Sequence, residues 1–205
     1  MGTPKAVIFD VGRVLFEWDP RYLYERLIED DRALEAFLAN VVTKEWHFQH
    51  DAGRPFAETS AELSAAYSEH AELIHAWGPR FNETIPHEVP GMPDIVRALD
   101  AAGVPLFAIT NFSGEFWRAW VPQYAELFDR FRDIVVSGDE KLVKPDPAIY
   151  ALALKRFGLK GPDAVFVDDS PANVEGANAA GIHGVLFTSA EDFRTELVRL
   201  GLLSS

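Results

Sequence analysis

The chain has 205 residues and a net charge of −13, from 19 basic and 32 acidic side chains, so its surface should repel nucleic acid. It has no cysteine, which excludes disulfides, thiolate metal sites and cysteine nucleophiles. Its apolar runs are too short for a membrane helix or a signal-peptide core, so we expect a cytoplasmic protein, monomer or homodimer, with no membrane partner.

Five short apolar runs, rich in β-branched residues, predict five strands. The runs lack a strict alternation of apolar and polar residues, so both faces of the sheet should be covered, as in a parallel sheet between helices. In chain order they are 6–9, 104–109, 134–136, 164–167 and 184–187.

Helical patterns with clear end signals lie between these runs. Asp146 and Pro147 open one helix and Gly158 closes it, while Ser189 and Asp192 form a capping box for the last helix. Strands that alternate with helices in this way predict an α/β, doubly wound (Rossmann-like) core around a five-stranded parallel sheet.

Residues 17–87 break the alternation, because they contain helical patterns and no clear strand pattern. Pro and Gly cluster at 86–91, where the chain returns to the alternating pattern. We therefore expect a core domain formed by 1–16 and 88–205, with a small all-helical domain inserted after the first strand.

Acidic side chains follow two of the predicted strands. Asp10 ends the first run, where it could simply cap a turn, and the adjacent Asp168 and Asp169 end the fourth. The carboxyl ends of parallel strands meet at one edge of a sheet, where such folds bind ligands. Three carboxylates gathered there would repel one another unless a cation neutralised them, and hard oxygen ligands suit Mg²⁺.

Two further segments supply groups that bind phosphate. Thr110 and Asn111 end the second run, and Lys144 immediately precedes the helix that begins at Pro147. Each residue taken alone has an ordinary structural explanation, since most lysines are solvated and most strand-end hydroxyls are satisfied locally. Lys141 is an alternative cation, but its earlier place in the same loop makes it the poorer candidate.

Together these segments resemble the four ordered motifs of the haloacid dehalogenase superfamily. They span nearly the whole chain, and their order and strand-end positions make the match specific. The helical insert resembles the C1 cap of subfamily I, which lies between the first two motifs. The segments that carry the resemblance are 9–15, 110–111, 144–146 and 167–173.

In phosphatases of this superfamily the first Asp attacks phosphorus, and water then hydrolyses the aspartyl-phosphate. The resemblance implies that Asp10 is the nucleophile of a Mg²⁺-dependent phosphatase acting on a small phosphorylated metabolite. It also implies that the metal binds Asp10, the Gly12 carbonyl and Asp169, with Asp168 either a ligand or next to the ligands.

The same resemblance implies that Thr110, the Asn111 N–H and Lys144 hold the phosphate oxygens. Together with the nucleophile, Thr110 and Lys144 are the predicted catalytic residues. Substrate contacts are also expected from Arg13, which follows the first motif, and from His50 in the aromatic and histidine-rich segment 46–54 of the cap.

The first motif departs from the usual phosphatase pattern at one position. Phosphatases of the superfamily usually carry a second Asp two residues after the nucleophile, and this chain has Gly12. General acid–base catalysis contributes roughly 10²–10⁴-fold, so its loss needs an explanation. Three explanations are open. Another group such as His47 or His50 transfers the proton, a water molecule transfers it slowly, or the leaving group needs no proton.

The last possibility describes hydrolytic 2-haloacid dehalogenases, which share the aspartate nucleophile and use no metal. Val14 and the acidic pair Asp168 and Asp169 argue against them, because dehalogenases tend to have Thr and Ser there. An Asp-x-Gly first motif, with Gly12, instead resembles bacterial sugar-phosphate phosphatases, so we favour a phosphatase. A non-catalytic metabolite-binding protein is the third hypothesis, and only Gly12 supports it.

Overall fold

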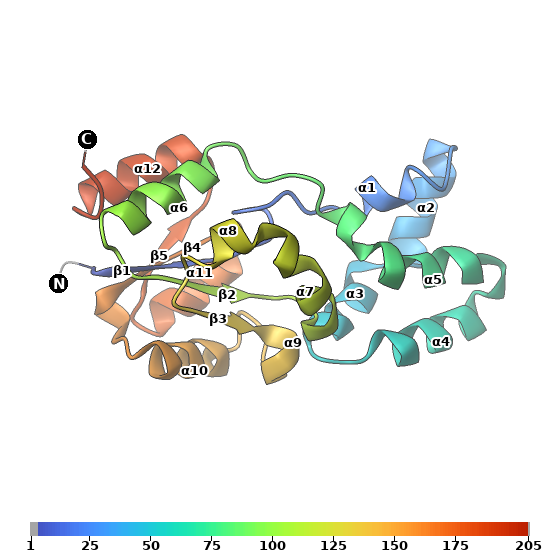
Figure 1. The fold of residues 1–205 in the computed structure, drawn as a ribbon. Coiled ribbons are helices and arrows are strands. Elements are labelled where there is room, and N and C mark those ends of the chain that lie inside the picture. The colour runs from blue at the N-terminus through green and yellow to red at the C-terminus, as the bar shows by residue number, and fades with distance from the viewer. Residues whose placement is uncertain (1–3, 205) are drawn as a thin grey trace.

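The computed structural model describes residues 4–204 and confirms the predicted parallel sheet. Five strands pair in the order β3-β2-β1-β4-β5, and all four pairings are parallel (Figure 1). The first strand is therefore central, which places whatever follows it at the middle of the sheet edge. The strands are β1 (Ala6–Phe9), β2 (Leu106–Thr110), β3 (Asp133–Val136), β4 (Ala164–Asp168) and β5 (His183–Leu186).

Both faces of the sheet are buried, and this explains why its strands read as continuous apolar runs. In β1, Val7 and Phe9 belong to one apolar cluster, with side chains of α6, α8 and α12. Ala6 and Ile8 belong to a second cluster, with side chains of α10 and α11. The core helices are α6 (Met92–Ala101), α7 (Gly114–Trp120), α8 (Ala125–Phe128), α9 (Ser137–Glu140), α10 (Pro147–Phe157), α11 (Pro171–Ala179) and α12 (Ala190–Arg199), with 3₁₀ turns Val121–Tyr124 and Gly161–Asp163.

The predicted helical insert forms a separate lobe beyond the carboxyl edge of the sheet (Figure 1). Its interior is aromatic, with Tyr24, Phe37 and Trp77 in contact and each at most 3% exposed. We call this lobe the cap. Its helices are α1 (Arg21–Tyr24), α2 (Asp31–Asn40), α3 (Lys44–Asp51), α4 (Phe56–Ala66) and α5 (Ala71–Arg80), with 3₁₀ turns Ser68–His70 and Phe81–Thr84.

Two chain segments connect the core and the cap, and they run side by side. The Glu17 N–H donates to the His87 carbonyl at 2.8 Å, and the Val89 N–H donates to the Leu15 carbonyl at 2.9 Å. This pairing supports the proposed limits of 1–16 and 88–205 for the core and 17–87 for the cap, of which residues 1–3 and 205 lie outside the described range. Over the described residues, each helix is too short or too polar to cross a membrane.

Candidate active site

Four of the predicted site residues meet at the carboxyl edge of the sheet. Asp10 follows β1, Thr110 ends β2, Asp168 ends β4 and Asp169 comes next. Because β1 lies between β2 and β4, their ends converge around Asp10. This is the edge that faces the cap (Figure 1).

Lys144 lies between two of these carboxylates. Its ammonium nitrogen is 2.8 Å from Asp10 Oδ1 and 2.6 Å from Asp168 Oδ2, and the residue is only 2% exposed. Burial opposes its charge, but the two carboxylates outweigh burial and raise the pKa of Lys144 above its ordinary value. Lys144 is therefore a permanent buried cation.

The Asn111 side chain fixes the backbone of Lys144. Asn111 Nδ2 donates to the Lys144 carbonyl at 3.0 Å, and the Lys144 N–H donates to Asn111 Oδ1 at 2.8 Å. Because Asn111 directly follows β2, the loop that carries the lysine is anchored to the rigid sheet. Asn111 is thus a positioning residue for Lys144.

Both oxygens of Asp168 are already engaged within the protein. Oδ1 accepts from the Ser170 N–H at 2.8 Å, and Asn173 Nδ2 lies 3.0 and 3.1 Å from the two oxygens. With Lys144 also bonded to Oδ2, the carboxylate orients that ammonium group. The sequence left Asp168 as either a metal ligand or a residue next to the ligands, and this geometry favours the second role.

The surroundings of Asp10 act on its pKa in opposite directions. Burial raises the pKa of Asp10 to about 7, Lys144 lowers it, and Asp168 raises it. The Val11 N–H donates to Oδ1 at 2.7 Å and, together with Lys144, fixes the orientation of the carboxylate. A cation next to Asp10 would favour its ionised form.

The acids at this edge fit a divalent cation. One carboxylate oxygen each of Asp10, Asp168 and Asp169 lies within 4.8 Å of the other two. Asp169 is half-buried, and burial and Asp168 raise its pKa, so a cation would relieve the repulsion between the acids. The Gly12 carbonyl accepts no backbone hydrogen bond in the described part of the chain and is a further oxygen ligand of the kind that Mg²⁺ prefers.

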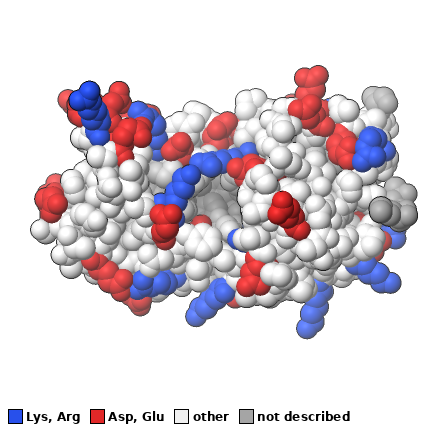
Figure 2. All heavy atoms as spheres, turned by 180° about the vertical axis from the view of Figure 1, so that it is seen from behind, with Lys and Arg blue, Asp and Glu red and all other residues white. Residues whose placement is uncertain are grey.

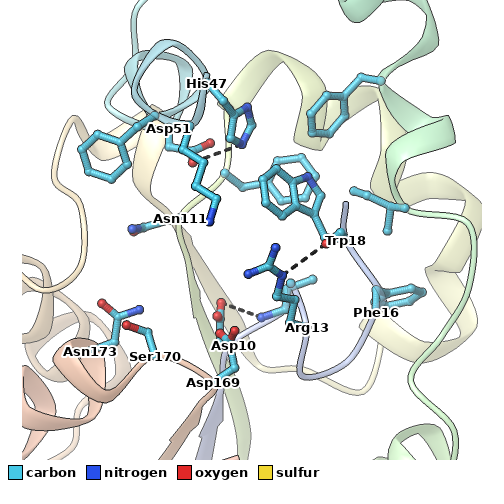
Figure 3. Close-up of a pocket in the computed structure, with 17 residues that line it drawn as sticks. Asp10, Arg13, Phe16, Trp18, His47, Asp51, Asn111, Asp169, Ser170 and Asn173 are labelled. Carbon is cyan, nitrogen blue, oxygen red and sulfur yellow. Dashed lines mark hydrogen bonds and ion pairs between the residues drawn. The ribbon is translucent and has the colours of Figure 1, made fainter. Parts of the chain in front are cut away.

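A cavity of about 390 Å³ lies between this edge and the cap. Figure 3 shows Asp10 and Asp169 on its core side and His47 and Asp51 on its cap side. The space-filling view in Figure 2 shows a hollow between the two lobes with acidic and basic side chains at its rim. Its apolar walls come from Val11, Phe16, Trp18, Phe48, Phe81, Ile85 and Phe112.

A family model described as haloacid dehalogenase-like hydrolase matches residues 4–181. The chain belongs to this family of hydrolases. A sesquiterpene phosphatase of Aspergillus oryzae is 28% identical over 195 residues, covering 92% of each chain. A phosphorylated carbohydrates phosphatase of Thermotoga maritima is 26% identical over 196 residues, covering 88% of this chain and 83% of its own. A HAD family enzyme of Bacteroides thetaiotaomicron, solved as a magnesium complex, has a TM-score of 0.73 at 19% identity, covering 97% of this chain and 100% of its own.

Arg13 lies at the rim of the cavity of this hydrolase, as expected for a substrate contact. Its backbone is left-handed, with φ of 60°, in the tight turn that follows β1. Arg13 Nε donates to the Trp18 carbonyl at 3.2 Å, and its charge lowers the pKa of Asp169. The guanidinium is therefore near the acids and remains a proposed ligand for an anionic substrate.

Three other predicted substrate contacts, Thr110, Lys144 and His50, lie outside the cavity lining. Thr110 is 1% exposed at the end of β2, next to Asn111, which does line the cavity. His50 is fully buried inside the cap, and its Nε2 is 2.6 Å from Thr59 Oγ1. Contact of Thr110 with phosphate remains a proposal, whereas the position of His50 argues against contact with substrate.

The cap contributes a cavity residue that the sequence did not single out. Asp51, at the end of α3, is 5% exposed and lines the cavity, with its Oδ2 at 3.4 Å from His47 Nε2. The sequence did hold a signal for Asp51. It is four residues after His47, so both side chains lie on one face of α3, next to the buried Trp46.

Proposed function

We propose that the chain is a Mg²⁺-dependent phosphatase that hydrolyses a small phosphorylated metabolite through an aspartyl-phosphate on Asp10. The observation that supports this proposal is the cluster of three carboxylates at the sheet edge. Oxygens of Asp10, Asp168 and Asp169 lie within 4.8 Å of one another, and the buried Lys144 contacts only the first two, so a divalent cation would relieve the repulsion that remains. We place the enzyme in the cytoplasm as a monomer or homodimer.

Each residue of the proposed site has its own role in phosphoryl transfer. An Asp10 oxygen attacks phosphorus as the bond to the leaving oxygen breaks, while Lys144 and the Asn111 N–H stabilise the phosphate oxygens. Bound to Asp10, Asp169 and the Gly12 carbonyl, Mg²⁺ would neutralise phosphate charge and let an anion approach an anionic nucleophile. Water then attacks phosphorus, which regenerates Asp10 and releases inorganic phosphate.

The test of this proposal is metal dependence. We expect hydrolysis of p-nitrophenyl phosphate with Mg²⁺ and its loss in EDTA. Metal ligands must be ionised, and burial raises the pKa of Asp10 to about 7, so Mg²⁺ affinity should increase from about pH 6 to about pH 8 with release of protons. Calorimetry in buffers of different ionisation enthalpy measures that release, and Mg²⁺ binding without it would contradict the proposed ligand set.

The second candidate function is a 2-haloacid dehalogenase, which Gly12 favours because halide leaves without a proton. The assay is halide release from 2-chloropropionate in EDTA. Release of halide, with no phosphatase activity in Mg²⁺, would replace the proposed function by this one. A chain that binds phosphorylated metabolites and lacks both activities would instead be a binding protein.

The cavity walls favour a substrate with an apolar organic part over the sugar phosphate that the first motif suggests. Seven apolar residues line it, and Phe48 is 43% exposed at its cap side although it is aromatic. An isoprenyl monophosphate would bury this surface, and a hexose phosphate would leave polar hydroxyls against it. The similarity to a sesquiterpene phosphatase supports the same substrate class.

We therefore expect kcat/KM for geranyl phosphate to exceed that for glucose 1-phosphate by about 10²-fold, the effect of burying ~100 Å² of apolar surface. Phe48→Ser should lower kcat/KM for geranyl phosphate and leave kcat/KM for glucose 1-phosphate unchanged, so the preference for geranyl phosphate should decrease. Phosphate release with both substrates measures this. Equal rates, or a preference for the sugar, would show that the apolar walls do not select the substrate.

A further inference from the structure

A phosphatase acting on an ordinary alcohol must protonate the leaving oxygen, and among the described residues of the core no side chain other than the proposed metal ligands is evidently placed to do so. Gly12 has no side chain. The Lys144 ammonium is bonded to Asp10 and Asp168, and these two carboxylates hold its proton firmly. The proton must come from another wall of the cavity.

Asp51 is the cap acid that faces this cavity. Its Oδ1 is buried and has no hydrogen-bond partner, which is costly for a carboxylate and suits a group that is completed by a substrate. Its Oδ2 is 3.4 Å from His47 Nε2, and the His47 ring stacks on Trp18 with centroids 4.9 Å apart. Figure 3 shows Asp51 across the cavity from Asp10.

The surroundings of Asp51 favour its neutral form. Burial raises the pKa of Asp51 to about 8, the Asp10 charge adds to this, and Lys144 and the Ser113 amide partly oppose it. Burial lowers the pKa of neighbouring His47 to about 3, so its imidazole is neutral. Of Asp51 and His47, therefore, the Asp51 carboxyl group carries the proton at neutral pH.

The end of α3 is also held firmly against the core. Ser137 Oγ donates to the Asp51 carbonyl at 2.6 Å, which ties the residue to the start of α9, directly after β3. The backbones of Gly53 and Gly138 approach so closely that a Cβ at position 53 would lie 2.7 Å from the Gly138 carbonyl oxygen. Asp51 is therefore held at a fixed place above the nucleophile.

We propose that Asp51 is the general acid and base of the reaction, in the role that Gly12 cannot fill. The proposal rests on the phosphatase function proposed above. As an Asp10 oxygen bonds to phosphorus, the bond from phosphorus to the alcohol oxygen breaks and that oxygen takes the Asp51 proton. The resulting Asp51 carboxylate then takes a proton from the water that attacks phosphorus, the bond to Asp10 breaks, and inorganic phosphate leaves.

The test compares two leaving groups in Asp51→Asn. For an alkyl phosphate such as hexyl phosphate, kcat/KM should fall by about 10²–10⁴-fold. For p-nitrophenyl phosphate, whose leaving group needs no proton, kcat/KM should change by less than about threefold, because it reports steps up to release of the alcohol. Its kcat should still fall, because water is no longer activated, and p-nitrophenolate should appear in an initial burst.

A rescue variant separates this role from a structural one. A side chain at position 12 has room, since a Cβ there would meet only Trp18 Cβ at 3.9 Å. Gly12→Asp in the Asp51→Asn background should raise kcat/KM for the alkyl phosphate at least tenfold. On a logarithmic scale this is roughly half of the smallest loss expected for Asp51→Asn alone. Asp51→Ser should match Asp51→Asn, and Glu45→Gln, which removes an exposed acid from the same helix, should leave both substrates unaffected.

An equal loss of kcat/KM with both substrates, or no loss with either, would overturn the assignment of Asp51, as would failure of the rescue in a folded protein. A wild-type chain that hydrolyses neither substrate in Mg²⁺ would instead overturn the phosphatase function. The two failures are therefore distinguishable.

Discussion

Replacing Lys144 by Met should lower the free energy of unfolding by about 3–5 kcal/mol, because it leaves two buried carboxylates without their cation. Asp10 and Asp168 lie at 2.8 and 2.6 Å from the ammonium, and Asp168 is fully buried. Methionine fills a similar volume, so the loss reflects charge and not a cavity. Phosphatase activity should disappear in the same variant.

The loss of stability should depend on pH in a defined direction. Burial raises the pKa of Asp10 to about 7, and Lys144 opposes that rise, so the pKa is higher still without the lysine. A raised folded-state pKa means that the folded chain holds more protons than the unfolded chain above the ordinary pKa of 3.8. Stability of Lys144→Met should therefore decrease as pH rises from about 4 past 7.

Urea unfolding in EDTA measures this effect. Lys141→Met is the matched control, because Lys141 is exposed in the same loop and its replacement should change stability by about 0.5 kcal/mol or less. A Lys144→Met protein as stable as this control at pH 8 would show that the buried carboxylates do not need the ammonium.

The core was predictable because one physical pattern specifies it. A strand buried on both faces must be apolar throughout, and β1 has Ala6 and Ile8 in one cluster and Val7 and Phe9 in the other. The predicted second run began at residue 104, but the strand begins at Leu106, because Pro105 has no N–H for the ladder and its carbonyl instead accepts from Val7.

The core half of the site was equally accessible from the sequence. Topology alone brings residues that end neighbouring parallel strands together, so Asp10 and Asp169 could be expected to meet. Lys144 was less certain, because it follows a short helix and not a strand. Two hydrogen bonds between the Lys144 backbone and the Asn111 side chain fix the position of Lys144, whereas the sequence had suggested a role only for the Asn111 backbone N–H.

The cap half could not be predicted in the same way. Which face of α3 meets the core depends on how the lobes dock, and this docking uses the close approach of Gly53 to Gly138 and the hydrogen bond from Ser137 to Asp51. These contacts join residues 85 or more apart in sequence. Histidine is the usual proton carrier at neutral pH, but burial keeps His50 neutral and Thr59 occupies its Nε2.

The largest expected loss of activity belongs to Asp10→Asn, which should lower kcat/KM by about 10⁴-fold or more for every phosphate ester, because an amide oxygen is a poor nucleophile. The fold should tolerate the change. Lys144 keeps its bond to Asp168, and the amide oxygen can still accept from the Val11 N–H. The variant should therefore unfold at a similar urea concentration.

Acid-quenched mass spectrometry identifies the covalent intermediate. Wild-type enzyme mixed with substrate should carry a phosphoryl group on the peptide that contains Asp10, and the Asn variant should carry none. Asp169→Asn is the informative comparison, because it removes a proposed metal ligand and leaves the nucleophile. Excess Mg²⁺ should partly restore its activity by mass action, whereas no Mg²⁺ concentration should restore Asp10→Asn. Activity of Asp10→Asn that recovers with Mg²⁺ would mean that Asp10 only binds the metal, and the bond to phosphorus would then have to form at another group.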